Sequence, residues 1–220
     1  MDSRAVSVYC ATCPLMKYIA TKAKVFNRGV APDSFLDELV VWGKAASEEL
    51  FAPNSNFDIF NKVRDELGPW ESPLHRRAVI LEVMRVLALF ESGCNWNEGV
   101  DTSKGVGNTT ENAESGAWQV SWDVRRLDPS LAHFLSEHVI TNGKQFQDAM
   151  KVIHPFAMTF VALLLRIDVR DFQRIANGPV RKGDERKKTW PNRVKLWDEK
   201  ESIYPWLSRA AVAELITFLA

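Results

Sequence analysis

Cysteine is scarce in this sequence, with three residues in 220. So small and odd a count excludes a fold held together by a framework of disulfides. The spacing of Cys10 and Cys13 suits a redox pair or half of a zinc site, but no preceding strand or βαβ pattern supports a redox role. A structural zinc needs four ligands, and the remaining candidates lack zinc-site spacing: Cys94, His75, His133, His138 and His154. We therefore expect no metal and no cofactor, with the cysteines acting as small, partly buried thiols.

An excess of charge of one sign is also missing, because 28 basic residues balance 28 acidic residues. This balance gives no indication of a nucleic-acid partner. No charge-free apolar run approaches about 18 residues, so no membrane-spanning helix is expected. The first residues carry scattered charges and lack the apolar core of a signal peptide. A protein acting outside the cytoplasm would therefore need another delivery route, or a leader that this sequence does not include.

Helical periodicity is abundant. Segment 31–50 has Asp33 and Ser34 as N-cap candidates, followed by apolar residues at helical spacing: Phe35, Leu36, Leu39, Val40 and Trp42. The pair Gly68-Pro69 is a helix stop signal. Further helices are predicted over residues 14–26, 56–68, 75–92, 131–140, 144–153, 155–167 and 201–220. The fold class is therefore predicted to be mainly α.

One of these segments is apolar around almost its whole circumference. From Ala78 to Phe90 the only charged residues are Glu82 and Arg85, whose spacing places them on one helix face, where they can form an ion pair. A helix this apolar belongs at the centre of a domain. It is followed by Glu91, and a carboxyl at the edge of a core is costly unless it is paired or protonated. Glu91 is thus either a solvated helix-end carboxylate or an acid that holds its proton.

The segment after this helix, 95–116, is polar, rich in Gly, Asn and Thr, and without helical period. A loop of about twenty residues inside a compact domain is uncommon and usually functional. The next segment, 117–123, alternates bulky apolar and polar residues, which predicts a short β-strand. The alternating residues are Trp118, Gln119, Val120, Ser121 and Trp122.

Two glutamates flank the polar loop: Glu91 at the end of the apolar helix and Glu114 among hydroxyl-bearing residues. We expect burial to favour the protonated form of Glu91 and polar surroundings to favour the carboxylate of Glu114. A glycosidase needs that difference, because one acid protonates the leaving oxygen and the other carboxylate stabilises or traps the cation. Asp101 and Glu111 lie in the same loop and compete with Glu114 for the second role.

The order of these motifs resembles the lysozyme-like superfamily, which includes lysozymes and soluble lytic transglycosylases. Glu91-Ser92 resembles the catalytic glutamate that ends a buried helix in those families. The stretch GAWQVS, residues 116–121, resembles their Gly-x-x-Gln-(Ile/Val)-Ser motif. Glu114 stands two residues before this stretch, where animal lysozymes of the hen type carry their second carboxylate.

A third match is weaker. The stretches IANGPVRKG and TWPNRVKLW resemble the Ala-Tyr-Asn-Ala-Gly-Pro turn and the downstream aromatic residue of lytic transglycosylases, and match Asn177 and Trp190. Ala176 departs from that pattern, because transglycosylases have tyrosine there. The loop between the first two motifs is also longer than in either relative. The resemblance covers residues 73–220, and we recognise no family in residues 1–72.

The resemblance implies a lysozyme-like α+β fold, in which a helical bundle surrounds a central buried helix and a small β-region lines a cleft. The catalytic domain would be residues 73–220. Residues 1–72 would be a helical region packed on it, and they are a candidate docking region for a partner protein. The implied activity is that of a muramidase, which cleaves the β-1,4 bond between N-acetylmuramic acid and N-acetylglucosamine in peptidoglycan.

The resemblance also assigns roles to residues. Glu91 would be the general acid, and Glu114 the nucleophile or electrostatic partner. The candidate substrate-binding residues are Ser92, Gln119, Trp118, Asn177, Asp101 and Glu111. Such an enzyme would degrade the cell wall in the periplasm or outside the cell.

Other functions stay open at this point. A lone Glu91 would favour a lytic transglycosylase, in which the sugar's own 6-hydroxyl ends the reaction. A chitinase or chitosanase would use the same fold on a related β-1,4-linked amino-sugar polymer, and a non-catalytic domain would only bind the wall or a partner. Segment 181–195 has seven basic and two acidic residues, a net charge of +5, which indicates a solvated loop or attraction to an anionic polymer such as the cell wall.

Overall fold

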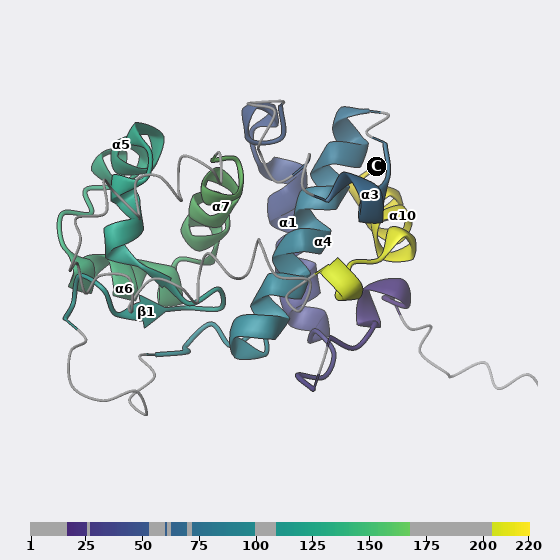
Figure 1. The fold of residues 1–220 in the computed structure, drawn as a ribbon, viewed down its shortest axis with the longest axis horizontal. Coiled ribbons are helices and arrows are strands. Elements are labelled where there is room, and N and C mark those ends of the chain that lie inside the picture. The colour runs from purple at the N-terminus through teal and green to yellow at the C-terminus, as the bar shows by residue number, and fades with distance from the viewer. Residues whose placement is uncertain are drawn as a thin grey trace, which may run out of the picture.

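Helices make up most of the protein in the computed structural model, which describes residues 17–25, 27–52, 60, 63–69, 72–99, 109–167 and 204–220 (Figure 1). Two short strands form one small sheet in this part of the chain. The prediction of a mainly α fold is therefore confirmed.

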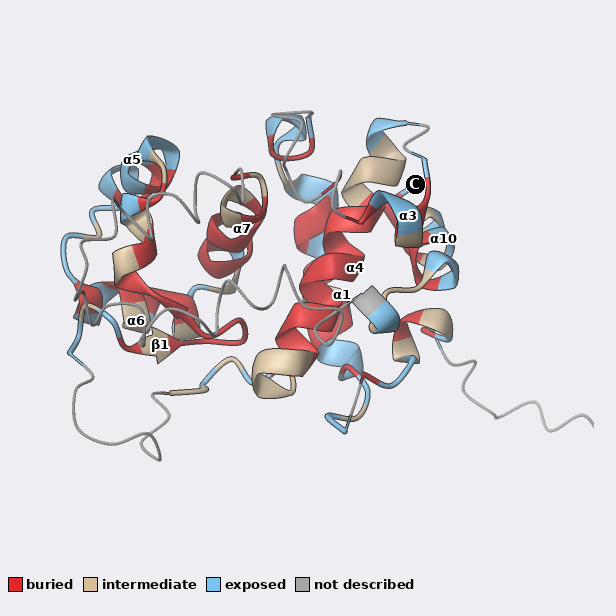
Figure 2. Ribbon diagram, in the orientation of Figure 1, coloured by how far each residue is buried: buried red, intermediate tan, exposed pale blue. Residues whose placement is uncertain are grey.

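The longest described helix, α4 (Pro73–Ser92), runs through the middle of a group of helices (Figure 1). It begins where the Ser72 hydroxyl accepts a hydrogen bond from the backbone N–H of His75, with a proline in the first turn, both of which favour a helix start. Every residue from Ala78 to Leu89 is buried (Figure 2). The helix ends at Gly93, whose φ of 69° is the left-handed conformation that glycine adopts at helix ends.

Two helices that are far apart in sequence pack along α4, namely α1 (Asp33–Ala45) and α10 (Arg209–Leu219). The three helices meet at Gly43, where a Cβ atom would lie 2.7 Å from the Leu81 side chain and 3.2 Å from that of Leu219. The apolar residues predicted for α1 are all buried: Phe35, Leu36, Leu39, Val40 and Trp42. Shorter described helices are η1 (Ala20–Lys22), η2 (Glu48–Leu50), α3 (Arg64–Leu67) and η6 (Tyr204–Trp206).

A second group of helices lies beside the first (Figure 1), consisting of α5 (Pro129–Glu137), α6 (Gly143–Val152) and α7 (His154–Leu165). Four phenylalanine rings form its centre, with centroids 5.1 to 6.4 Å apart: Phe134, Phe146, Phe156 and Phe160. Helix α7 connects the two groups, because it contacts α1 and α4 as well as α5 and α6. At this contact Trp42 donates its indole N–H to the Thr159 hydroxyl over 3.1 Å.

The sheet consists of β1 (Glu114–Ser115) and β2 (Val120–Ser121), which pair antiparallel with Glu114 opposite Ser121. The turn between them requires glycine at its first position. Gly116 has a φ of 75°, and a Cβ atom there would lie 2.8 Å from the carbonyl oxygen of Met150 in α6. The strands are followed directly by η4 (Trp122–Arg126).

Most of the predicted helices are confirmed in the described residues, including α1, α4, α5, α6 and α7. The helix predicted over 201–220 is confirmed from Arg209 to Leu219 as α10, whereas residues 204–206 form the separate η6 and Ser208 caps α10. The helix predicted over 56–68 is described at residue 60 and as α3, and it stops at Gly68 as expected. Residues 53–59 and 61–62 lie outside the described residues.

The helix predicted over 14–26 is wrong for residues 17–25, which contain only the 3-10 turn η1. The backbone N–H groups of Ile19, Ala20 and Thr21 donate hydrogen bonds to the carboxylate of Glu214 in α10. These three backbone N–H groups are thus bonded to a side chain of α10 and not to backbone carbonyl oxygens of a helix of their own. Residues 14–16 and Phe26 lie outside the described residues.

The strand predicted over 117–123 is also shorter than expected. Only Val120 and Ser121 pair in the sheet, while Trp118 and Gln119 belong to the turn and Trp122 begins η4. Gln119 has a left-handed φ of 48°, which breaks the alternation that a strand would need. The tryptophans of this segment are nevertheless buried.

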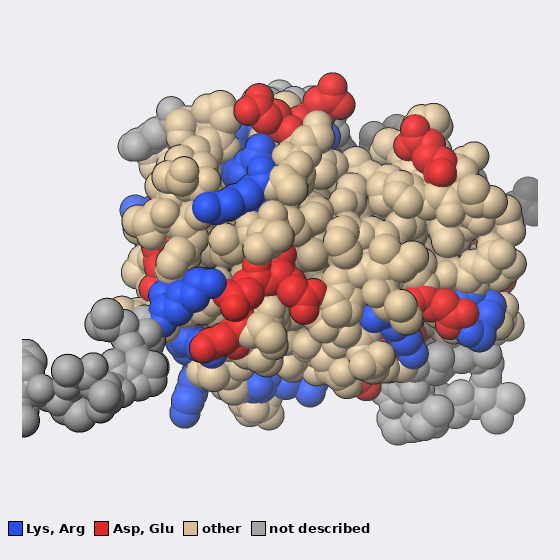
Figure 3. All heavy atoms as spheres, turned by 180° about the vertical axis from the view of Figure 1, so that it is seen from behind, with Lys and Arg blue, Asp and Glu red and all other residues tan. Residues whose placement is uncertain are grey.

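Charged side chains on the face opposite to that of Figure 1 stand in small groups separated by wide uncharged surface (Figure 3). Several charged residues form ion pairs, such as Lys17 with Asp37, Lys22 with Asp33 and Lys144 with Asp148. Figure 3 shows no extended surface of one sign over the described residues of this face, in agreement with the balanced net charge.

Candidate active site

The end of α4 is joined to the β-turn by one side chain. The Ser92 hydroxyl donates a hydrogen bond to the carbonyl oxygen of Ala117 over 2.7 Å and accepts one from the backbone N–H of Asn95 over 3.0 Å. Ser92 follows Glu91 directly, and Ala117 lies in the turn that follows Glu114. The two motifs that suggested a glycosidase therefore meet, although about 25 residues separate them in the sequence.

The two predicted catalytic carboxyls lie on these joined elements. Glu91 is in the last turn of α4 and Glu114 is in β1, and both residues are partly exposed. Part of each residue is therefore open to solvent. Ser92, which the resemblance assigned to substrate, holds the two elements together through its hydroxyl.

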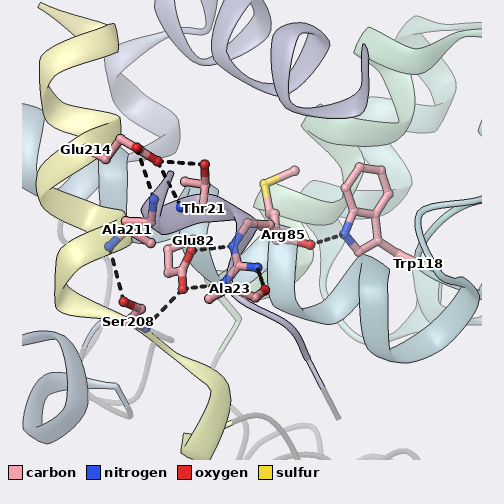
Figure 4. A network of polar contacts seen from close by, with 10 residues as sticks. Thr21, Ala23, Glu82, Arg85, Trp118, Ser208, Ala211 and Glu214 are labelled. Atoms are coloured by element: carbon pink, nitrogen blue, oxygen red, sulfur yellow. Dashed lines mark hydrogen bonds and ion pairs between the residues drawn. The ribbon is translucent and has the colours of Figure 1, made fainter. Parts of the chain in front are cut away.

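The Trp118 and Gln119 side chains are both buried, Trp118 against α4 and Gln119 bonded within the turn. The indole N–H of Trp118 donates to the carbonyl oxygen of Met84 in α4 over 2.9 Å (Figure 4). The Gln119 side-chain amide donates to the carbonyl oxygen of Gly116 over 3.0 Å. Only 5% of Trp118 and 9% of Gln119 is exposed, so both residues stabilise the turn itself.

The other candidates for the second carboxylate are arranged differently. The Glu111 carboxylate forms an ion pair with Arg125 of η4, with 3.4 Å between oxygen and nitrogen. Its backbone oxygen also accepts a hydrogen bond from the N–H of Asp123 over 3.0 Å. Asp101 lies outside the described residues, as do Asn177, Trp190 and segment 181–195.

The sequence did not single out the turn from Asn95 to Glu98. The Asn95 side chain accepts a hydrogen bond from the N–H of Asn97 over 3.0 Å and donates one to the Glu98 carboxylate over 2.9 Å. The backbone oxygen of Glu98 accepts the N–H of Gly116 over 3.0 Å. Glu98 is thus a further carboxyl beside the joint. An asparagine at the start of a polar turn is the one sequence signal that could have pointed to it.

Two more residues near this turn come from distant elements. Trp96 stacks on the His154 ring, with 3.9 Å between centroids and 8° between planes. The Nδ1 atom of His154, at the start of α7, contacts the carboxylate of Glu38 in α1. Because 116 positions separate Glu38 from His154, no local pattern in the sequence could have predicted their contact.

Cys94 follows the C-cap of α4 as a buried free thiol. Burial raises the pKa of this thiol to about 12, with Arg85 and Lys22 opposing the shift. The thiol therefore stays protonated at neutral pH, where it is a poor nucleophile. The prediction of a small buried thiol is confirmed for Cys94, whereas Cys10 and Cys13 lie outside the described residues.

Comparison of the chain with protein-family models, with curated proteins and with solved structures found no match.

No described helix is by itself long and apolar enough to cross a membrane, while α6 and α7 taken together pass that test of length and composition across a bend of 110°. Within the described ranges, no group of three or more His, Cys, Asp or Glu side chains is placed to hold a metal ion.

Proposed function

We propose that the protein is a lysozyme-like glycosidase, a muramidase acting on the β-1,4 bonds of peptidoglycan or a related amino-sugar polymer at the cell wall. The observation that carries this proposal is the 2.7 Å hydrogen bond from Ser92 to Ala117. It joins the helix end that carries Glu91 to the turn that follows Glu114. Two partly exposed glutamates on joined elements supply the pair of carboxyl groups that glycoside hydrolysis requires.

In the proposed reaction, Glu91 donates its proton to the glycosidic oxygen while the bond from that oxygen to the anomeric carbon breaks. The Glu114 carboxylate stabilises the positive charge that develops on the sugar ring, attacks the anomeric carbon, or activates a water. A carboxyl separation of about 5–5.5 Å would give retention, and about 6.5–9.5 Å inversion. If Glu114 takes no part, the 6-hydroxyl of the sugar closes an anhydro ring, which is transglycosylase chemistry.

The test is the turbidity of purified peptidoglycan walls with wild type and with Glu91→Gln. We expect the variant to lose activity by about 10²–10⁴-fold, because it removes the proton donor of general acid catalysis, and to keep its thermal stability. Glu137→Gln is the matched control, since Glu137 is an exposed glutamate that also ends a helix. Wild-type turnover by Glu91→Gln would contradict the proposal. Reducing ends among the products would indicate hydrolysis, and anhydro ends a transglycosylase.

A second candidate function is a non-catalytic domain that binds the cell wall or a partner. The buried, internally bonded side chains of Trp118 and Gln119 favour it, because the turn motif then serves the fold and not a substrate. Co-sedimentation of the wild type with walls, without any release of soluble fragments, would support this function over the first.

A further inference from the structure

Of the three tryptophans near the candidate site, Trp96 is the least buried. Trp118 and Trp122 are each 5% exposed, whereas Trp96 is only partly buried. Trp96 lies five residues after Glu91, in the turn that contacts Gly116 through the backbone of Glu98. An aromatic face next to a glycosidic site is a surface on which the C–H face of a sugar ring packs, because it is apolar and flat.

The Trp96 ring is fixed by residues from three other elements. It stacks on His154 of α7 with 3.9 Å between centroids, and it lies 5.2 Å from Phe35 of α1 and 5.2 Å from Trp118 of the turn. The latter two contacts are tilted and edge-on, at 36° and 74°. Such aromatic pairs contribute about 0.5–1.5 kcal/mol each beyond the area they bury, so the ring orientation is set by packing.

His154 is itself oriented by a carboxylate. Its Nδ1 atom contacts Glu38, and because a carboxylate only accepts hydrogen bonds, Nδ1 carries the proton. The side chains of His154 and Glu38 are 28% and 39% exposed, so both lie at the surface next to Trp96. Polar groups of Asn95 and Glu98 lie in the same turn as Trp96. They are suited to hydrogen bonding with sugar hydroxyl and acetamido groups.

We propose that Trp96 is the aromatic ring on which an N-acetylated amino sugar packs, and that Glu38 and His154 are the positioning residues that hold this ring in place. The inference rests on the proposed function for the identity of the sugar. It adds that α1, which precedes the segment resembling lysozymes, contributes to the site through Glu38 and Phe35.

The experiment measures binding of triacetylchitotriose, the β-1,4-linked trimer of N-acetylglucosamine, by the change in tryptophan fluorescence of the full chain. We expect Trp96→Ala to weaken binding by about tenfold, which corresponds to the loss of one stacked ring. Trp206→Ala is the control, because Trp206 is partly exposed in η6. Unchanged binding by a folded Trp96→Ala, or no binding by the wild type, would overturn the proposal. If Trp96→Ala does not fold, unchanged binding by Trp96→Asn would do the same.

The positioning role is tested by separating KM from kcat in wall lysis. His154→Ala removes the stacked ring, and we expect KM to rise by about three- to tenfold while kcat stays within about twofold. His154→Phe restores a flat ring, so its KM should lie between those of His154→Ala and wild type. If His154 had only a structural role, both variants would be less stable and His154→Phe would not lower KM. Equal KM values in His154→Ala and wild type would overturn the positioning role.

The two proposals fail in different ways. Glu91→Gln should lose lysis yet bind the trimer as tightly as wild type. Full lysis by Glu91→Gln would contradict the proposed function and leave the binding result at Trp96 standing. Loss of wall lysis by Glu91→Gln together with unchanged trimer binding by Trp96→Ala would overturn only the further inference.

Discussion

At the scale of single residues, the strongest polar feature of the core is the pair formed by Glu82 and Arg85. Both side chains are fully buried, with hydrogen bonds of 2.7 and 2.8 Å between the guanidinium and the two carboxylate oxygens (Figure 4). Burial raises the pKa of Glu82, while the hydrogen bonds and charge of Arg85 oppose that shift. The ion pair predicted from the sequence is thus confirmed, and its complete burial makes each partner dependent on the other.

We predict that Arg85→Ala lowers the free energy of unfolding by about 3–5 kcal/mol, because it leaves the Glu82 carboxyl buried without its partner. The double variant Glu82→Leu with Arg85→Met should lose less than the single variant, since no uncompensated buried charge remains. Urea unfolding measures both. Arg126→Ala, at an exposed position of η4, should stay close to wild type. A single variant as stable as wild type would show that the pair contributes little.

At the scale of elements, two glycines with similar backbone angles have different surroundings. Gly93, at the end of α4, has a φ of 69° and no atom within 4 Å of the position that a Cβ would occupy. Gly116 has a φ of 75°, but a Cβ there would lie 2.8 Å from the Met150 carbonyl oxygen. Gly93 is therefore favoured only for its left-handed backbone conformation. Gly116 is favoured for the same conformation and also because a side chain there would collide with α6.

We therefore predict that Gly93→Ala costs about 1–2 kcal/mol of stability, the usual penalty of a left-handed non-glycine residue. Gly116→Ala should cost more than that, because the turn must also move away from α6. Denaturant unfolding compares the two variants directly. Equal losses would mean that the contact with Met150 relaxes without cost.

The helices were predictable because their signals are local. The apolar positions of α1, the largely apolar stretch of α4 and the stop at Gly68 can all be recognised within one or two turns of sequence. The errors arise where a distant partner decides the conformation. Residues 19–21 are held by Glu214, about 195 positions away, and the turn at Gln119 is set by packing between α4 and α6.

The same distinction applies to the candidate site. Glu91, Ser92 and Glu114 could be selected from short motifs, and the structure places these motifs in contact. No pattern in the sequence distinguishes Trp96 from the other tryptophans of this region. The roles of Glu38 and His154 were not predictable at all, because their contact joins α1 to α7 and depends on the whole fold.

At the scale of the whole molecule, segments from opposite parts of the chain are tied together by one carboxylate. Glu214 of α10 accepts hydrogen bonds from the backbone of residues 19–21 and from the Thr21 hydroxyl over 2.7 Å (Figure 4). Partial burial opposes ionisation, but these hydrogen bonds together lower the pKa of Glu214 below its ordinary value. The boundary predicted at residue 72 remains a prediction, although α1 packs on α4, α7 and α10.

We predict that the hydrogen bonds between Glu214 and residues 19–21 stabilise the fold less in acid. A carboxyl whose pKa is lower in the folded state stabilises the fold above its unfolded pKa, and this contribution is lost as the pH falls through the folded pKa. The stability difference between wild type and Glu214→Gln should therefore be constant at neutral pH and shrink below about pH 4.3, the ordinary glutamate pKa. Urea unfolding from pH 7 to pH 3 measures it. The pKa of Asp37 is also lowered, by Lys17 and Tyr18, but Asp37 is present in both proteins, so its contribution cancels in the difference. A stability difference that does not change with pH would contradict the prediction.

The packing of α10 on α4 also has a consequence for synthesis of the protein on the ribosome. Helix α10 covers α4 and binds residues 19–21, yet it is translated about 190 residues after them. Until α10 emerges, the largely apolar α4 has one side uncovered, and residues 19–21 have no carboxylate to bind. Long-range contacts of this kind delay folding and leave apolar surface exposed for longer. A nascent chain halted before α10 should therefore be a favoured client of chaperones, and release of α10 from the ribosome should end that dependence.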